Sequence, residues 1–373
     1  MQLDEIHRAW VLLRADLYNA DRNPYKIHQI LPTILTLLQQ GCGVCVMSAM
    51  GVAFMPDPDV RTAMFVYKKL AEILPHDIEW VEEYKDAEIL LGKVYFVENP
   101  YCDNRDREYS SVFQSEMLAQ FDVIVHDTLN HLDKEFVSSL GMLTSEKPQA
   151  LGRYLEGLES CIQTTRQSKV GLIVGGDQIA WQLRLIRHLV PHLSFLAVGG
   201  ELALVMMGKG QEMPGCLHDD LFRTLQALRA EKVKVLYPVD VVAYSSETQR
   251  NRICLYQDLE PVESVKDLAT QSRSRILSQI QKDQVDLVIL SGTIGHHLDP
   301  RYSRGTDILV QELAGLSHTK VLIGKDVALA ANRLSVLGGY QYVLEGNSVE
   351  IDYLSSGNPS ILSWLLKEGV GVS

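Results

Sequence analysis

Short runs of apolar residues alternate along the chain with segments in which apolar residues recur at helical spacing. Four apolar runs predict strands in the first 150 residues: 11–14, 41–48, 94–97 and 121–126. Segments 30–40 and 60–74 carry apolar residues three and four positions apart, which indicates helices. Strands and helices therefore alternate in this part of the chain.

The same alternation begins again after residue 165. Five further apolar runs predict strands: 170–174, 193–198, 233–236, 287–290 and 321–323. Continuous apolar strands separated by helices are typical of a parallel sheet that helices cover on both faces. We therefore expect an α/β protein with two Rossmann-like parallel-sheet domains.

A hinge helix is expected to join the two domains. Segment 148–163 has the spacing of an amphipathic helix, with an apolar face formed by Leu151, Tyr154, Leu155, Leu158 and Ile162. The predicted boundaries are 1–150 for the N-terminal domain, 151–165 for the hinge helix and 166–356 for the C-terminal domain. The tail, 357–373, predicts a short apolar helix that docks on the N-terminal domain.

Composition and charge exclude several classes of protein. Lysine and arginine number 35 and aspartate and glutamate 47, which gives a formal net charge of −12. Binding nucleic-acid phosphates needs clustered cations, so we expect no nucleic-acid partner. No apolar run approaches the ~18 residues of a membrane span, and the acidic start of the chain lacks the basic region of a secretory signal. Six cysteines in 373 residues do not make a disulfide framework, so we expect a cytoplasmic protein without a membrane partner.

Glycines follow four of the strands predicted in the second half. The four junctions are Val174-Gly175-Gly176-Asp177, Val198-Gly199-Gly200-Glu201, Ser291-Gly292-Thr293-Ile294-Gly295 and Ile323-Gly324-Lys325-Asp326. Ligands of open α/β sheets bind outside the carboxyl ends of the strands, and glycine allows close backbone approach to a phosphate. One interpretation is a phosphate-cradling cleft, and the other is that these glycines only make tight turns. Four junctions together favour the cleft.

The order of motifs resembles the phosphoglycerate kinase family along nearly the whole chain. The segments that carry the resemblance are Leu13–Asp16, Lys26–Ile34, Ser48–Gly51, Glu98-Asn99, Asp127, Gly175-Gly176, Gly199-Gly200, Leu236–Val242, Gly292–Gly295, Arg304–Thr306 and Asp326. The resemblance implies the phosphoglycerate kinase fold, with the acid substrate on the N-terminal domain and the nucleotide on the C-terminal domain. It also implies phosphate transfer between 1,3-bisphosphoglycerate and Mg-ADP, hinge closure and a monomer.

Site residues are carried over position by position from this resemblance. Arg14, Asp16 and Lys134 would bind the substrate, and Lys26 and Gly346 occupy catalytic positions. The positions on the nucleotide side are Gly175, Gly176, Gly199, Gly200, Gly292, Gly295, Gly324, Lys325 and Asp326. Asp326 is also the metal-side position. The implied cofactor is Mg²⁺ with ATP or ADP, where nucleotide binding is retained.

The chain departs from the family pattern where the chemistry is done. In the N-terminal domain the catalytic Arg is Lys26, and other family positions for His, Arg or Asn are Tyr18, Ala49, Val52, Tyr101 and Asp133. In the C-terminal domain the two active-site lysines are Gln178 and Gln182, and the ribose-binding Glu falls at Leu298. Phosphoryl transfer depends on positioning and on cations at the equatorial oxygens, so these losses predict an impaired enzyme. The features that persist are those that folding needs: the turn glycines, Pro32, Pro238 and the apolar strands. Arg14, Asp16 and Asp326 therefore have an alternative, structural role as salt-bridge or helix-cap residues.

Three other motifs have ordinary explanations. Cys42-x-x-Cys45 lies in a predicted buried strand without a second cysteine pair, which disfavours a zinc or redox site. His296-His297 with Asp299 falls in the loop after Gly295, where a new metal site is the alternative to a solvated loop. Segment 208–210 (GKG) lacks the context of a P-loop.

Three functional hypotheses follow. The first, which we favour, is a catalytically impaired homologue that acts by binding, in a regulatory, scaffolding or nucleotide-sensing role, with a nucleotide, a phosphoglycerate or a protein as partner. The second is an active glycolytic phosphoglycerate kinase in which Lys26, Lys134 and Lys325 compensate for the losses. The third is a new small-molecule activity in the old cleft, made less polar by Tyr18, Tyr101 and Trp181.

Overall fold

Two compact units make up the chain, the first with Met1–Glu159 and the second with Ser160–Gly357. This computed structural model describes residues 1–18, 20, 23–49, 63–82, 90–98, 100–129, 136–208, 215–260, 262–346 and 348–356. The predicted tail helix, 357–373, lies outside the described residues.

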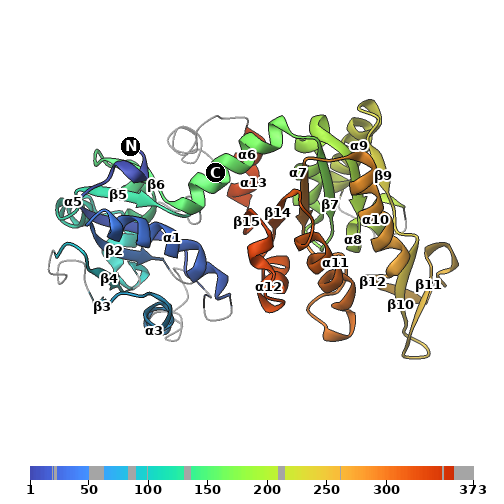
Figure 1. Ribbon diagram of the computed structural model, residues 1–373, viewed down its shortest axis with the longest axis horizontal. Coiled ribbons are helices and arrows are strands. Elements are labelled where there is room, and N and C mark those ends of the chain that lie inside the picture. Colours follow the sequence, from blue (N-terminus) through green and yellow to red (C-terminus); the bar gives the residue numbers. More distant parts are fainter. Residues whose placement is uncertain are drawn as a thin grey trace. The chain divides into compact units, whose positions relative to one another are not determined.

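A six-stranded parallel sheet forms the centre of the first unit, in the order β3-β4-β2-β1-β5-β6 (Figure 1). Its strands are β1 (Trp10–Ala15), β2 (Gly43–Ser48), β3 (Ile78–Val81), β4 (Val94–Val97), β5 (Val123–His126) and β6 (Gln149–Leu151). Its described helices are α1 (Tyr25–Gln39), α3 (Met64–Ile73), α4 (Asn104–Arg107) and α5 (Ser111–Ala119). Successive residues of β1 enter different cores: Val11 and Leu13 pack with α1, and Trp10 and Leu12 pack with α5. Both faces of the sheet are therefore covered, as the continuous apolar runs predict.

The second unit holds a second six-stranded parallel sheet, in the order β15-β14-β13-β7-β8-β9. Its strands are β7 (Val170–Val174), β8 (Leu193–Val198), β9 (Lys234–Leu236), β13 (Leu287–Ser291), β14 (Thr319–Ile323) and β15 (Tyr342–Leu344). Helices of this unit are α7 (Ile179–Leu189), α8 (Gly200–Met206), α9 (Gly215–Ala230), α10 (Thr270–Asp283), α11 (Arg304–Ala314), α12 (Lys325–Arg333) and α13 (Ser348–Ser356). The prediction of an α/β fold with two parallel-sheet domains is confirmed.

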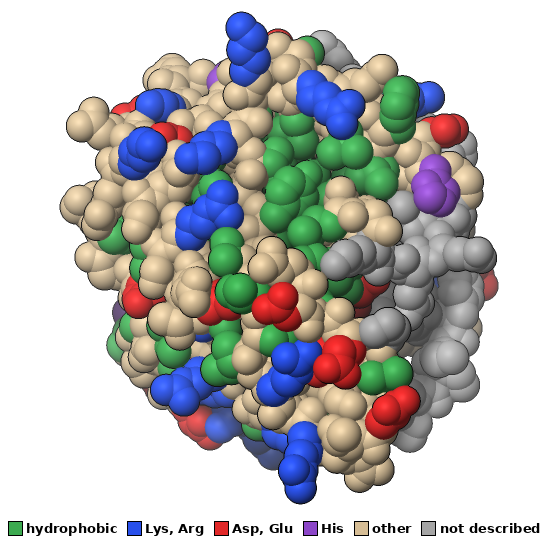
Figure 2. All heavy atoms as spheres, turned by 90° about the vertical axis from the view of Figure 1, so that its right-hand side faces the viewer, with side chains coloured by type: hydrophobic (Ala, Val, Ile, Leu, Met, Phe, Trp, Pro, Cys, Tyr) green, Lys and Arg blue, Asp and Glu red, His purple; other side chains and the backbone are tan. Residues whose placement is uncertain are grey.

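A small antiparallel sheet, β11-β10-β12, completes the second unit. Its strands are β10 (Asp240–Ser245), β11 (Arg250–Leu255) and β12 (Glu263–Leu268). The apolar pattern did not predict these strands, because β11 is mostly exposed and its sequence lacks an apolar run. Figure 2 shows a face of this unit where apolar side chains gather in a stripe bordered by Lys and Arg. Exposed apolar side chains of the described part of the unit include Phe222 and Ile253, at 61% and 70% exposure.

The helix α6 (Arg153–Gln167) spans the division between the two units. The predicted helix extends too far toward the N-terminus, because Gln149–Leu151 instead pairs with β5 as the edge strand β6. Asp127 fixes the start of α6: its Oδ1 accepts from the Tyr154 amide (2.9 Å), and its Oδ2 accepts from the Thr33 hydroxyl (2.6 Å). Burial raises the pKa of Asp127 to about 7.

None of the helices in the described part of the chain combines the length and the apolar character that crossing a bilayer requires.

Candidate functional site

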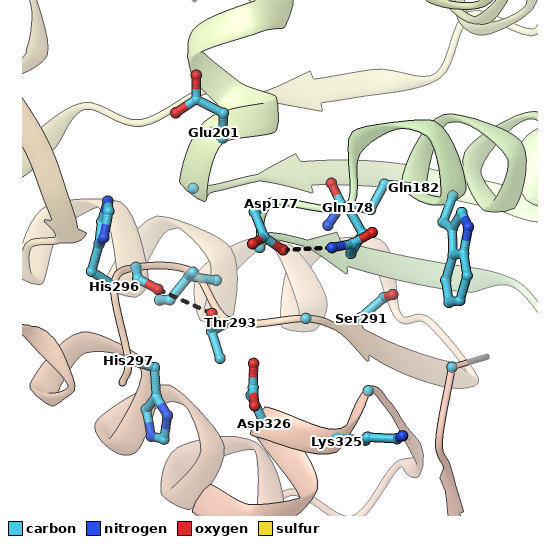
Figure 3. A pocket seen from close by; sticks show the side chains of 18 of the residues that line it. Asp177, Gln178, Gln182, Glu201, Ser291, Thr293, His296, His297, Lys325 and Asp326 are labelled. Atoms are coloured by element: carbon cyan, nitrogen blue, oxygen red, sulfur yellow. Dashed lines mark hydrogen bonds between the residues drawn. The ribbon is translucent and has the colours of Figure 1, made fainter. Parts of the chain in front are cut away.

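A cavity of about 740 Å³ opens at the carboxyl ends of the strands of the second unit (Figure 3). The turns that follow β7, β8, β13, β14 and β15 all contribute to it. This is the edge at which parallel sheets place their ligands. The structure brings together most of the residues predicted for the nucleotide side: Gly176, Gly200, Gly292, Gly295, Gly324, Lys325, Asp326 and, from the catalytic prediction, Gly346.

Two glycines lock neighbouring turns together beneath the cavity. A Cβ atom on Gly175 would overlap the carbonyl oxygen of Thr293. Gly292 has φ +73°, and a Cβ atom there would overlap the carbonyl oxygen of Gly175. The turns after β7 and β13 therefore pack backbone against backbone. Gly175 and Gly199 do not line the cavity and instead belong to this packed floor.

Five glycine amides of these turns are already hydrogen-bonded within the protein. Five N–H groups donate to protein acceptors: Gly175 to Ser291 (2.9 Å), Gly200 to Ile294 (3.2 Å), Gly292 to Ile323 (2.9 Å), Gly324 to Leu344 (2.9 Å) and Gly346 to Glu350 (2.7 Å). The first four acceptors are backbone carbonyls, and the fifth is a carboxylate. These amides are therefore not available to cradle a phosphate, which offers only acceptors.

Two side chains of the same region, Glu350 and Gln182, are hydrogen-bonded to backbone groups of the strand-end turns. Glu350, which is 1% exposed, accepts from the Gly346 amide at the start of α13. Gln182, which is 5% exposed, donates through Nε2 to the Gly175 carbonyl. The Oε1 of Gln182 is buried and has no donor among the residues that the structure describes. Only one end of this amide is therefore satisfied.

Carboxylates outnumber cations in the cavity lining. The charged lining residues of the described chain are Asp177, Glu201, Asp299, Asp326, Glu345, Lys266 and Lys325. Asp177 follows β7 and Asp326 lies in the first turn of α12, and their side chains extend toward the cavity from opposite sides (Figure 3). Asp299 forms an ion pair with Arg301 at 2.6 Å.

Several of these charges have no ion-pair partner in the described part of the chain. Asp177 accepts only a weak hydrogen bond from the Gln178 amide, at 3.3 Å. Glu201, Asp326, Lys266 and Lys325 make no ion pair among the described residues. The charges of the cavity are therefore presented to whatever enters it.

Apolar side chains supply the rest of the lining. Helix α7 contributes Trp181 and Leu185, and α13 contributes Ile351. Helix α8 and strand β12 contribute Leu204 and Val265. The cavity therefore combines an apolar wall with a few unpaired charges, the composition expected of a small-molecule site.

The two histidines of the cavity rim differ in their surroundings. The Nε2 of His297 lies 3.1 Å from Asp307 Oδ1, and Arg333 donates to the same carboxylate oxygen at 2.6 Å. His296 is exposed overall. Partial burial of its ring lowers its pKa, and the positive charge of Lys266 lowers it further. Among the described residues, no three His, Cys, Asp or Glu side chains come close enough to hold a metal ion.

The residues predicted to bind the acid substrate in the first unit are built into its fold. Arg14 is 4% exposed and donates to the carbonyls of Ser138 (3.1 Å) and Thr128 (2.9 Å). Lys26 and Asp16 form an ion pair of 2.7 Å with side chains 2% and 7% exposed. Asp16 is therefore in a salt bridge, as its structural alternative has it, whereas the Arg14 guanidinium is bonded to backbone carbonyls. Lys134, also predicted for the substrate, lies outside the described residues.

The two cysteines of the Cys-x-x-Cys motif belong to different cores. Cys42 packs in the core that includes α1, and Cys45 packs in the core on the other face of the sheet. Both thiols are buried, and burial raises the pKa of each. Residues directed to opposite faces do not form a joint metal or redox site.

Sequence reasoning missed three polar residues of this region. Glu201 directly follows Gly199-Gly200, so its position after a strand-end glycine pair was a usable signal. Lys266 reaches the cavity from β12, and Glu350 reaches the Gly346 amide from α13. Lys266 is brought to the site by tertiary packing, whereas Glu350 lies only four residues after Gly346, in the first turn of α13.

Comparisons with known proteins agree on one family. A family model described as phosphoglycerate kinase matches residues 4–357. The phosphoglycerate kinase of Borrelia hermsii (strain HS1 / DAH) is 23% identical over 354 residues, which cover 88% of each chain. The phosphoglycerate kinase of Pelotomaculum thermopropionicum is 24% identical over 375 residues, which cover 92% of this chain and 93% of the relative.

Solved structures show the same fold. The structure of phosphoglycerate kinase from Coxiella burnetii has a TM-score of 0.75 at 19% identity and covers 99% of both chains. That of phosphoglycerate kinase from Pyrococcus horikoshii OT3 has a TM-score of 0.79 at 18% identity and covers 98% of both. Because the family model spans both units, this chain belongs to the phosphoglycerate kinase family.

Proposed function

We propose that this protein is a catalytically impaired member of its family that acts by binding a small molecule in the cavity of its second unit. The observation that carries the proposal is that polar groups where the family would bind the phosphates are hydrogen-bonded to other groups of the protein. Gln182 stands where the family has a lysine, and its amide is tied to the Gly175 carbonyl. The Gly346 amide is tied to the Glu350 carboxylate.

Charge at the reacting centre supports impairment. Phosphoryl transfer relies on cations that stabilise the equatorial oxygens, and one transition-state arginine is worth about 10³–10⁵ in rate. A charge-assisted hydrogen bond contributes about 1.5–3 kcal/mol. Here two lysine positions are neutral, as Gln178 and Gln182, and Asp177 adds a negative charge beside them. These losses act at one centre and are not additive, and we expect each to remove a charge-assisted contact to the phosphate.

The acid-substrate side supports the same conclusion. Lys26, at the position of the catalytic arginine, is 2% exposed and pairs with Asp16. An ammonium group held in a buried ion pair does not stabilise phosphate without breaking that pair, and a lysine lacks the bidentate fork of arginine. Arg14 likewise donates to two backbone carbonyls.

A magnesium nucleotide fits the donor set of the cavity poorly. Asp326 is a suitable magnesium-side carboxylate, since Mg²⁺ is commonly bound by one or two carboxylates together with substrate phosphates. The phosphates themselves would meet three unpaired carboxylates, and four of the lining glycine amides, those of Gly200, Gly292, Gly324 and Gly346, are already hydrogen-bonded. We therefore expect Mg-ATP and Mg-ADP to bind weakly.

A second candidate, an active kinase with compensating lysines, has one observation in its favour. Lys325 is exposed, lines the cavity at the start of α12 and has no ion-pair partner among the described residues. In the active version this ammonium group would replace one of the missing lysines.

A coupled assay with 3-phosphoglycerate and Mg-ATP, run also in the reverse direction, separates the two candidates. We expect no turnover above background. The variant Gln178→Lys restores one family cation, and we expect it to remain inactive because Asp177, Glu350 and the Lys26–Asp16 pair are unchanged. Substantial activity of the wild-type chain, or a large rate gain in Q178K, would exclude the impaired-enzyme proposal.

A further inference from the structure

The cavity is rich in hydrogen-bond acceptors. Asp177, Glu201 and Asp326 present carboxylates without ion-pair partners among the described residues. Gln182, which also lines the cavity, carries a buried carbonyl oxygen without a donor in the described part of the chain. The Gln182 amide cannot be turned around, because its Nε2 must face the Gly175 carbonyl. An unpaired buried acceptor costs free energy until a donor reaches it.

Several hydrogen-bond donors in the same space are already used within the protein. The amides of Gly175, Gly200, Gly292, Gly324 and Gly346 are bonded internally, and the side-chain hydroxyl of Thr293 donates to the Gly295 carbonyl at 3.0 Å. The charged donors of the lining are Lys266 and Lys325. Asp326 lies next to Lys325 in the first turn of α12, where its negative charge reduces the positive potential of the helix N-terminus.

The electrostatic field of the cavity adds to this bias. A cleft with apolar walls concentrates the field of the charges that line it. The unpaired carboxylates of the lining outnumber its two lysines, and the whole chain has a net charge of −12. A ligand with a negative charge is repelled on approach, and a ligand with a positive charge is attracted.

The apolar part of the lining indicates that the ligand carries a flat apolar group. Trp181 and Leu185 of α7 and Ile351 of α13 supply a flat aromatic face and aliphatic surface. A tryptophan face beside carboxylates is a favourable environment for an organic cation. The volume of about 740 Å³ lies in the range of sites for drug-sized molecules.

We infer that the cavity takes an organic cation with several N–H donors on a flat apolar body, rather than a nucleoside polyphosphate. This inference rests on the proposed binding function and names the ligand class of the same site. The cationic head meets Asp177 and Asp326, and the apolar body packs against Trp181. An amidinium or guanidinium group matches this set because it is planar, charged and carries donors only.

A charge series of one shape tests the inference. Benzamidine, benzamide and benzoate have nearly the same size, and at neutral pH they carry one positive charge, no charge and one negative charge. Their affinities for the full chain are measured by isothermal titration, with Mg-ADP titrated in parallel. We expect benzamidine to bind at least about tenfold more tightly than benzoate, the effect of one charge-assisted hydrogen bond, with benzamide between them.

Two variants locate the effect in the cavity. The double variant Asp177→Asn, Asp326→Asn should lower the affinity for benzamidine by about tenfold or more and leave benzamide binding nearly unchanged. Lys325→Gln should raise the affinity for benzamidine and lower that for benzoate. Asp219→Asn removes one exposed carboxylate of α9 outside the cavity, and it should change none of the three affinities. Thermal unfolding of each variant shows that it is folded.

The outcomes separate this inference from the proposed function. Micromolar binding of Mg-ADP without binding of benzamidine overturns the cation inference and leaves a binding role for the cavity. Equal affinities across the series, or a response to Asp219→Asn as large as the response to the cavity variants, also overturns it. Binding of neither Mg-ADP nor any member of the series overturns both the inference and the proposed binding function. Turnover in the kinase assay overturns the proposed function, whatever the series shows.

Discussion

The charged residues predicted for the site are held differently in the two units. In the first unit Arg14, Lys26 and Asp16 are nearly fully buried, and each is bonded to a partner within the fold. In the second unit Asp177 and Asp326 are exposed in a cavity and make no ion pair with described residues. Groups of the first kind stabilise the fold, whereas groups of the second kind are available to a ligand. The comparison therefore supports the proposal that the chain binds a ligand in its second unit.

Physical chemistry predicts different costs for removing the two kinds of charge. Breaking a buried ion pair leaves one charge unpaired in a medium that solvates it poorly, which costs about 3–5 kcal/mol. Removing an exposed, unpaired charge changes stability by less than about 0.5 kcal/mol. Stability measurements on matched variants can therefore test the comparison directly.

The largest effect is expected at Lys26. Lys26→Met removes the ammonium group and leaves the Asp16 carboxylate buried without its ion-pair partner, still accepting a hydrogen bond from the Tyr18 amide at 3.0 Å. We expect the free energy of unfolding to fall by about 3–5 kcal/mol, measured by urea denaturation at pH 7. The double variant Asp16→Asn, Lys26→Met removes both charges and should recover most of this loss. A loss below about 1 kcal/mol in K26M would show that the pair is not buried in solution.

The sequence predicts most strands of the parallel sheets because these strands are continuous apolar runs, whereas β3, β6 and β15 were not predicted. All nine runs identified from the sequence are strands in the structure, and alternate residues of β1 supply two separate cores. The small antiparallel sheet could not be predicted, since the exposed strand β11 owes its place to pairing with β10. The start of α1 was placed too late, because Tyr25, Lys26 and Ile27 in its first turn are buried only by tertiary packing.

The position of the site could be predicted, but not its chemistry. Strand-end glycines locate the cavity because backbone turns must pack there, as Gly175 and Gly292 do. Whether a polar group is already hydrogen-bonded is settled only in the folded chain. The Arg14 guanidinium donates to the carbonyls of Ser138 and Thr128, which are far away in the sequence. The Gly346 amide donates to Glu350, four residues further along the chain.

An intermediate effect is expected from the pH dependence of stability at Asp127. Its pKa is about 7 in the folded protein because of burial, and about 3.9 in an unfolded chain. Between these values the folded state binds the proton more tightly, so this group makes stability fall as pH rises from about 4 to 7. Asp127→Asn abolishes that contribution while keeping an acceptor for the Tyr154 amide.

Urea denaturation at pH 5 and pH 7 measures the change. We expect the decrease in unfolding free energy over this interval to be smaller in D127N than in the wild-type chain, by on the order of 2 kcal/mol. A residual decrease should persist, because burial also raises the pKa of Asp106 to about 6 and that of Asp267 to about 7. An unchanged or steeper decrease in D127N would show that Asp127 is ionised in the fold at neutral pH.

The smallest effect is expected at Lys325, the counterpart of Lys26 in the comparison. This lysine is exposed at the start of α12, where a positive charge is unfavourable beside the positive helix end. Lys325→Gln should therefore leave the free energy of unfolding within about 0.5 kcal/mol of the wild-type value, with any shift toward greater stability. Urea denaturation at pH 7, run beside K26M, gives the contrast in one experiment. A loss in K325Q comparable to that in K26M would mean that Lys325 also belongs to the fold, and the division between structural and ligand-facing charges would then fail.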